Sequence, residues 1–129
     1  KDDGSIREIH IHDYFQYIDR FPASNNPKTY MKKPQILWRS SLHTIKLLFK
    51  THHYSLEEMK FRGKLKSKFT TTKNSFHHLF VSSGNIFVIW HRQTWTINQG
   101  YSIFIPAGVG QYTLKTNHCY QATILKTYV

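Results

Sequence analysis

Short runs in which apolar and polar residues alternate fill the chain from Pro34 to its end. Because side chains two residues apart point to the same face of a strand, each run predicts a strand with one buried face. Turn residues, such as "SGN" at 83–85 and "NQG" at 98–100, separate the runs at short spacing. Many short strands with regular turns predict an all-β sandwich or barrel over residues 34–129 rather than an α/β sheet.

The N-terminal part of the chain carries a helical pattern instead. A capping box begins at Ser5, and apolar residues follow at the spacing of one helix face: Ile11, Tyr14, Phe15 and Ile18. We expect an amphipathic helix over residues 5–20, which Pro22 ends. The expected organisation is an N-terminal helical extension over residues 1–33, followed by a β-domain over 34–129.

The overall composition is that of a globular domain. Of the 129 residues, 40% are apolar and 16% are aromatic, which is enough to bury a sizeable core. No apolar run approaches the ~20 residues of a membrane-spanning helix, so no membrane partner is expected. The single cysteine, Cys119, has no second thiol to pair with, which favours an intracellular setting. Because the sequence begins with Lys1 rather than methionine, we interpret it as a piece of a longer protein.

Positive charge is the strongest bias in the composition. The chain has 18 basic and seven acidic residues, a net charge of +11, which suits nucleic acid or an acidic partner. In "KFRGKLKSKF" a cation stands at every second position, so a single strand would carry all of them on one face: Lys60, Arg62, Lys64, Lys66 and Lys68. Such a face is either a solvated outer surface of a sheet or a contact for phosphates or an acidic partner. Since no base-reading helix is evident, any DNA contact would be nonspecific.

The residue types that carry catalysis do not form a recognisable site. Nine histidines are present, but the adjacent pairs at 52–53 and 77–78 would point to opposite faces of a strand. No two histidines have the i, i+4 spacing of a helical metal site. Seven acidic residues give little basis for paired-carboxylate catalysis. The sequence therefore predicts no catalytic residue, no metal and no cofactor.

The stretch "GYSIFIPAGVGQ" at 100–111 resembles the second motif of the cupin superfamily in the spacing of its first two glycines and its proline. The resemblance implies a jelly-roll β-barrel. It also implies that other residues occupy the metal-ligand places of cupins: Thr70, Thr72, His77 and Gln111. Hydroxyl and amide oxygens with one imidazole are a poor set for a catalytic divalent metal. The resemblance therefore points to a metal-free, non-enzymatic cupin.

Among metal-free cupins, the chain resembles the C-terminal domain of the CENP-C family of inner-kinetochore proteins. The resemblance rests on "FRGKL" at 61–65, on the segment from "HHLFV" to "QYTLK" at 77–115, and on the closing "YQATILKTYV". It covers residues 45–129, whereas the first 40 residues match nothing in that family, which fits an invertebrate or otherwise divergent member. The resemblance implies a homodimerisation and docking domain in the nucleus, at the centromere and kinetochore. Its expected partner is a CENP-A loading factor or another centromere protein.

Two other classes of cupin remain open. The sugar-sensing cupin domains of AraC-type transcription regulators also carry "IPAG" turns, which stand here at 105–108. A DNA-binding helix-turn-helix after Val129 would favour that class. The other class is a cupin dioxygenase or isomerase, and metal bound inside the barrel would reveal it.

Apolar residues beyond those needed for one core predict two contact surfaces. If His77 points into the barrel, outward residues near it and on two further strands form a homodimer interface: Phe76, His78, Phe80, Phe87, Ile89 and Leu125. Apolar residues of "LHTIKLLF" would form a second surface for a protein partner: Leu42, Ile45, Leu47 and Phe49. An alternative cover for the first surface is the amphipathic N-terminal helix of the same chain.

Overall fold

The computed structural model describes residues 11–18, 32–64, 66–116 and 121–129. The chain divides into two units, 1–31 and 32–129, and each is described by itself. In the first unit, helix α1 (Ile11–Tyr17) lies within the helix predicted over residues 5–20, and the prediction for 5–10, 19 and 20 falls outside the described residues. Helix α1 buries none of its side chains. The described residues contain no helix that is long and apolar enough to span a bilayer.

Strands make up the second unit, as the alternation predicted. The structure has ten of them in the described residues: β1 Gln35–Arg39, β2 His43–Lys50, β3 Ser55–Phe61, β4 Lys66–Thr70, β5 His77–Ser83, β6 Asn85–Trp90, β7 Gln93–Asn98, β8 Ser102–Ile105, β9 Gln111–Lys115 and β10 Ala122–Tyr128. The predicted all-β class is therefore confirmed.

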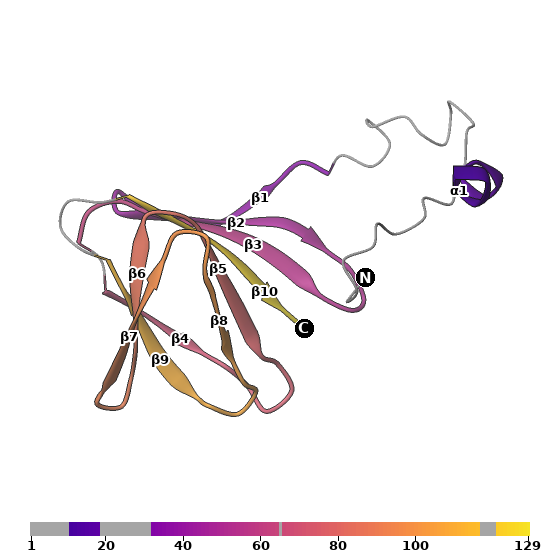
Figure 1. The fold of residues 1–129 in the computed structure, drawn as a ribbon. Coiled ribbons are helices and arrows are strands. Elements are labelled where there is room, and N and C mark those ends of the chain that lie inside the picture. Colours follow the sequence, from indigo (N-terminus) through magenta and orange to yellow (C-terminus); the bar gives the residue numbers. More distant parts are fainter. Residues whose placement is uncertain (1–10, 19–31, 65, 117–120) are drawn as a thin grey trace, which may run out of the picture. The chain divides into compact units, whose positions relative to one another are not determined.

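The strands form two antiparallel sheets around a common interior (Figure 1). One sheet has six strands in the order β1-β2-β3-β10-β5-β8, and the other has four in the order β4-β9-β6-β7. The chain passes from one sheet to the other after each of six strands, which are β3, β4, β5, β7, β8 and β9. This repeated crossing between two sheets is the arrangement of a jelly roll, which confirms the predicted barrel.

The core lies between the two sheets. On β5, Leu79 and Val81 are fully buried, and Phe80 between them lies half-buried on the outer face. On β10, Ile124 points inward and Leu125 outward. The inward side chains of six strands make up the apolar core: Met59, Phe61, Leu79, Val81, Ile86, Val88, Ile105, Tyr112, Leu114, Ala122 and Ile124. Period-two burial of this kind is what specifies the register of each strand.

Two glycines stand where the chain changes sheet. Gly84, between β5 and β6, has a φ of +75°, and a Cβ at this position would collide with the carbonyl oxygen of Gln121. Gly63, which follows β3, has a φ of +69°. Both angles lie in the left-handed region, which glycine adopts without the strain that a side chain would bring.

The break at Gly63 divides the basic run. Strand β3 ends before Arg62 and belongs to the six-stranded sheet, whereas β4 begins at Lys66 and belongs to the four-stranded sheet. The prediction that one strand carries all five cations on one face is therefore wrong. These cations are Lys60, Arg62, Lys64, Lys66 and Lys68. The physical reason is that the turn at Gly63 carries the chain from one sheet to the other.

Candidate functional site

Polar side chains occupy part of the barrel interior, at inward positions of four strands. We call them the interior cluster: Glu57 on β3, His77 on β5, Tyr112 on β9, and Lys126 and Tyr128 on β10. The exposed fraction is 5% for Glu57, 7% for His77 and 8% for Lys126. Because buried charges are tolerated only when they have partners, the contacts of these residues decide what the interior can do.

Glu57 is the centre of one half of the interior cluster. The Nζ atom of Lys126 lies 2.8 Å from its Oε2 atom, and the hydroxyl of Tyr128 donates a hydrogen bond of 2.7 Å to its Oε1 atom. Burial, and then the hydrogen bond and charge of Glu57, raise the pKa of Tyr128 to about 12. The Lys126 ammonium also lies 4.6 Å from the centre of the Tyr128 ring. Both carboxylate oxygens therefore have partners, and the ammonium neutralises the carboxylate.

His77 and Tyr112 form the other half of the interior cluster. The Nδ1 atom of His77 lies 2.7 Å from the hydroxyl oxygen of Tyr112. Burial, followed by the nearby charge of Lys126, lowers the pKa of His77 to about 4. Burial and the charge of Glu57 raise the pKa of the Tyr112 hydroxyl. At neutral pH both side chains are therefore uncharged, and this pair is a hydrogen-bonded part of the core.

The ligand places that the cupin resemblance assigns do not come together. His77 points inward, but Thr70 pairs with Gln111 on the exposed face of the four-stranded sheet, and Thr72 is exposed as well. The side chain that points inward after the turn is Tyr112, one residue further on. The cupin resemblance places Thr70, Thr72 and Gln111 at ligand positions inside the barrel, but all three are exposed.

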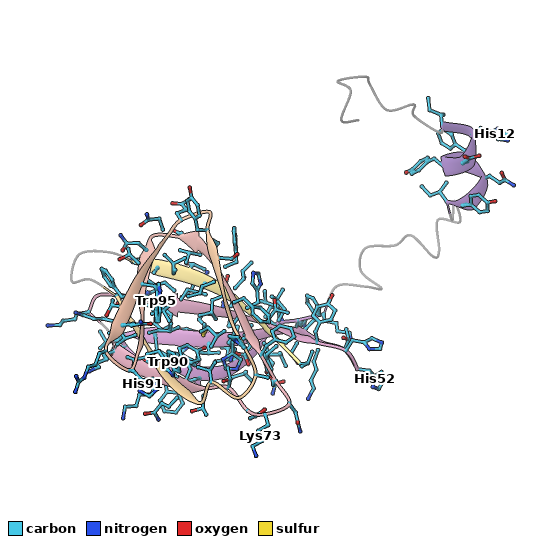
Figure 2. The ribbon with its side chains drawn as sticks, turned by 60° about the horizontal axis from the view of Figure 1, so that its bottom comes forward. His12, His52, Lys73, Trp90, His91 and Trp95 are labelled. Atoms are coloured by element: carbon cyan, nitrogen blue, oxygen red, sulfur yellow. The ribbon has the colours of Figure 1, made fainter. Side chains whose placement is uncertain are left out.

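The interior does not fit a divalent metal. Its donors near His77 are a phenol hydroxyl and one imidazole, and its one carboxylate, Glu57, already binds the ammonium of Lys126. Elsewhere, His52 lies at the β2–β3 turn and His91 at the β6–β7 turn (Figure 2). In the described part of the chain, no three His, Cys, Asp or Glu side chains gather closely enough to hold a metal ion.

The residues predicted for a dimer interface lie on two different sheets. His78 and Phe80 on β5 and Leu125 on β10 point outward from the six-stranded sheet, with Phe76 just before β5. The other two, Phe87 and Ile89, are on β6, on the outer face of the four-stranded sheet. The predicted set is therefore not one surface. Phe104 on β8, which the sequence reasoning missed, joins the first group, because it pairs with His78 and its ring lies 5.1 Å from that of Phe76.

The residues predicted for a partner surface are also divided. Ile45 and Leu47 on β2 share a face with the inward residues of β3, and Ile45 packs against the core. An irregularity between Leu47 and Phe49 shifts the register, so Phe49 lies opposite Leu56 on the other face. Leu42, in the β1–β2 turn, is 45% exposed. The binding role of Leu42, Ile45, Leu47 and Phe49 stays a prediction.

Among the pockets of the described residues, one is basic and one is apolar, and the apolar pocket shares Tyr112 with the interior cluster. The basic pocket, of about 330 Å³, lies at the β1–β2 turn and is lined by Arg39, Ser40, Ser41, His43, Thr44, Lys46, Lys60 and Arg62. The apolar pocket, of about 460 Å³, is lined mainly by residues of β6 to β9: Val88, Trp90, Trp95, Ile103, Phe104, Ile105, Pro106, Val109 and Tyr112. Trp90 ends β6 beside the β6–β7 turn, and Trp95 lies in β7, where it pairs with Val88 (Figure 2).

Sequence reasoning missed the interior cluster and most of the basic pocket. The signal for the cluster was present, because Lys126 follows Ala122 and Ile124 at period two, and Glu57 precedes Met59 in the same way. Two opposite charges at inward positions of two strands indicate an ion pair. The basic pocket had no such signal, because it depends on β1 and β2 lying beside β3.

Comparisons with known proteins agree with this architecture. Among solved structures, the Cnp3 cupin domain of Schizosaccharomyces pombe has 15% identity and a TM-score of 0.60, and the match covers 70% of this chain and 63% of that chain, less than two thirds. The Cupin_2 domain of an XRE family transcriptional regulator from Enterobacter cloacae has 13% identity and a TM-score of 0.61, covering 68% and 96%. KdgF from Halomonas sp. has 10% identity and a TM-score of 0.61, covering 75% and 86%. At these identities the likeness shows the fold.

Sequence comparison identifies the family. No curated protein gives a significant match. A family model described as "Mannose-6-phosphate isomerase, cupin domain" matches residues 44–124, which is more than half of the chain. This match spans β2 to β10 and so includes the whole core. The chain therefore belongs to the cupin-domain family of mannose-6-phosphate isomerase.

Proposed function

We propose that this cupin domain is a non-enzymatic homodimerisation and docking domain of a centromere protein, in the nucleus, that recruits a CENP-A loading factor or another centromere partner. Its family takes its description from an isomerase, but the interior here holds a Lys–Glu ion pair and an uncharged His–Tyr pair. The fold likeness to Cnp3, a CENP-C protein, supports the centromere assignment.

The observation that carries the dimer proposal is an apolar outer face on the six-stranded sheet. Antiparallel pairing places Leu125 beside Phe80 and His78 beside Phe104 on this face. Phe104 is 56% exposed, and its ring contacts that of Phe76. Exposed aromatic clusters of this kind mark interaction sites. A two-fold axis would let the same patch cover itself in a second copy, which is the commonest symmetry of homo-oligomers.

The dimer proposal is tested by the mass of the full chain in solution. We expect light scattering to give twice the mass of one chain, and Phe80→Glu and Leu125→Glu to give one chain, because each buries a carboxylate in the interface. Phe87→Glu is the matched control, since Phe87 is half-buried on the other sheet. Folded Phe80→Glu and Leu125→Glu proteins that keep the parent mass would refute the interface.

The docking surface is expected at the β1–β2 end of the six-stranded sheet. Trp38 and Leu42, near the β1–β2 turn, are 56% and 45% exposed. At the opposite end of these strands, the β2–β3 hairpin extends past the other sheet (Figure 1). Leu47→Arg should abolish capture of a CENP-A loading factor while the dimer persists. Reversing the charge of Lys66 and Lys68 should mainly slow association, because rim charges act on the encounter rate. Loss of capture in the lysine variant alone would make the basic residues the site.

The second candidate function is ligand sensing, in an AraC-type or related transcription regulator. The apolar pocket favours it, because its lining is aromatic and aliphatic apart from the Tyr112 hydroxyl and the two indole N–H groups, as in sites for small apolar ligands. The likeness to the regulator domain from Enterobacter cloacae supports the same role. Trp90 and Trp95 fluorescence would report such a ligand, and Trp95→Ala should remove the response. A ligand that changes this fluorescence without changing the mass would favour sensing over docking.

A further inference from the structure

The basic pocket gathers cations from three adjacent strands. Arg39 on β1 pairs with Thr44 on β2, and Thr44 pairs with Lys60 on β3, so the three lie side by side on the outer face of the sheet. Lys46 lies two residues from Thr44 on the same face, and Arg62 follows the end of β3. The chain thus places four positive side chains around one concave space of about 330 Å³.

Within the described residues, carboxylates neutralise these four cations only in part. Glu58 lies 3.3 Å from the ammonium of Lys60 and 3.9 Å from that of Lys46, so one acid serves two lysines. Within the described residues, no carboxylate lies within ion-pair distance of Arg39 or Arg62. The guanidinium groups of Arg39 and Arg62 therefore line the same pocket with N–H donors available to a ligand.

The wall of the pocket is held by the β1–β2 turn. The Ser40 hydroxyl oxygen accepts hydrogen bonds from the backbone N–H groups of Leu42 and His43, at 3.3 and 3.1 Å. The backbone N–H of Arg62 donates to the Leu42 carbonyl at 2.7 Å, which ties this turn to the end of β3. A site whose shape is fixed before binding loses less entropy when a ligand enters.

We propose that the basic pocket binds the phosphate monoester of a phosphorylated serine or threonine in an extended segment of a protein partner. Such a phosphate carries a charge of about −1.5 to −2 at neutral pH and three acceptor oxygens, which match guanidinium forks and hydroxyl donors. A nucleic-acid backbone instead carries one charge per phosphate and gains its affinity along a track of cations. The cations here surround one concavity, and Lys66 and Lys68 belong to the other sheet.

The surroundings of the pocket favour a peptide over a free phosphorylated metabolite. Strand β1 is an edge strand of the six-stranded sheet, so its outer edge can pair with an added strand. Its residues Ile36, Leu37 and Trp38 are 47%, 45% and 56% exposed, and Arg39 follows them directly. A peptide that pairs with β1 would offer apolar side chains to these residues and its phosphate to the pocket.

The proposal rests on the docking role of the proposed function, for which it supplies the chemistry of the partner. The basic pocket is lined by residues on or next to β1, β2 and β3, whereas the proposed dimer face lies on β10, β5 and β8, so we expect phosphate binding to persist in a single chain. If Phe80→Glu gives a single chain that still binds phosphate, the two proposals have been tested separately.

The test is a titration of the ¹⁵N-labelled full chain, followed by NMR at constant ionic strength. The probes are O-phosphoserine, serine, and a short valine-flanked phosphoserine peptide with its unphosphorylated form. We expect saturable shifts at the amides of Ser41 and Thr44 with the phosphorylated probes, and about tenfold tighter binding of the peptide. The variant Arg39→Gln/Arg62→Gln should lose about tenfold or more in affinity. Lys66→Gln/Lys68→Gln, which removes the same charge from the other sheet, should keep it.

Each contrary result overturns a defined part of the proposal. Equal loss in both double variants would mean that net charge, rather than the pocket, holds the phosphate. Equal affinity for O-phosphoserine and the peptide would make the site one for small phosphorylated molecules. Short duplex DNA that shifts the same amides, where the phosphorylated probes do not, would replace the phosphopeptide by nucleic acid. Circular dichroism melts of both double variants establish that they are folded.

Discussion

Glu57 and Glu58 are neighbours on β3, yet they point to opposite faces of the same sheet. Glu57 faces the barrel interior, where it is 5% exposed and lies 2.8 Å from the ammonium of Lys126. Glu58 faces outward, where it is shared between Lys60 at 3.3 Å and Lys46 at 3.9 Å. The same residue type, one position apart, therefore forms a closed pair inside and a loose pair outside.

Burial, rather than the number of ion pairs, decides what a charge does in this fold. Inside the barrel the low dielectric strengthens the pair but makes either unpaired partner very costly. Outside, water and salt screen the pair, and its contribution to stability is small. The interior pair therefore fixes β10 against β3, whereas the outer cations remain able to bind a partner.

The largest expected effect comes from breaking the interior pair. Lys126→Met should lower the free energy of unfolding by about 3–5 kcal/mol, because it leaves the Glu57 carboxylate buried with only the Tyr128 hydroxyl as partner. Chemical denaturation of the full chain measures it. The double variant Glu57→Gln/Lys126→Met should recover most of the loss, since the introduced amide is neutral and its oxygen still accepts the Tyr128 hydrogen bond. If the unfolding free energy of Lys126→Met stays within about 1 kcal/mol of that of the parent, water reaches the pair.

An intermediate effect is expected from acid, through His77. Burial and the charge of Lys126 lower the pKa of His77 to about 4 from 6.5, so between these pH values the unfolded chain binds the proton and the folded chain does not. This contribution to stability is complete above pH 6.5 and is lost as the pH falls toward 4, at no more than about 1.4 kcal/mol per pH unit. Denaturation across this window measures the slope, and His77→Gln should make it shallower. An unchanged slope in His77→Gln would show that His77 does not cause the loss of stability between pH 6.5 and 4.

Strand positions and the two-sheet fold were predictable because period-two burial is a local property of the chain. The inward direction of Leu79 and Val81 follows from the same alternation. The interior pair was predictable in principle, since Glu57 and Lys126 stand in the inward phase of their strands. Glu57 and Lys126 were missed because only the apolar residues of their strands were used to predict the core.

Other features depend on contacts that no local pattern records. The inward residue after the 100–111 motif is Tyr112 rather than Gln111, because the direction of β9 is set by its pairing with β4 and β6. The shift between Leu47 and Phe49 arises in the pairing of β2 with β3. The basic pocket needs strands that meet only in the folded sheet. Alternation within single strands named the residues of these surfaces, and the structure places them on different faces or sheets.

The smallest expected effect comes from breaking the outer pair. Glu58→Gln should change the free energy of unfolding by less than about 1 kcal/mol, because its lysine partners are 33% and 46% exposed and lose only a screened attraction. The same change removes the carboxylate that lies beside Lys46 and Lys60 of the basic pocket, so the affinity for O-phosphoserine should rise by about two- to threefold, and less so at high salt. Denaturation and NMR titration of one protein preparation measure both quantities. A loss of stability as large as that of Lys126→Met would remove the distinction between the two faces of β3, and an unchanged affinity would place the phosphate away from Lys46 and Lys60.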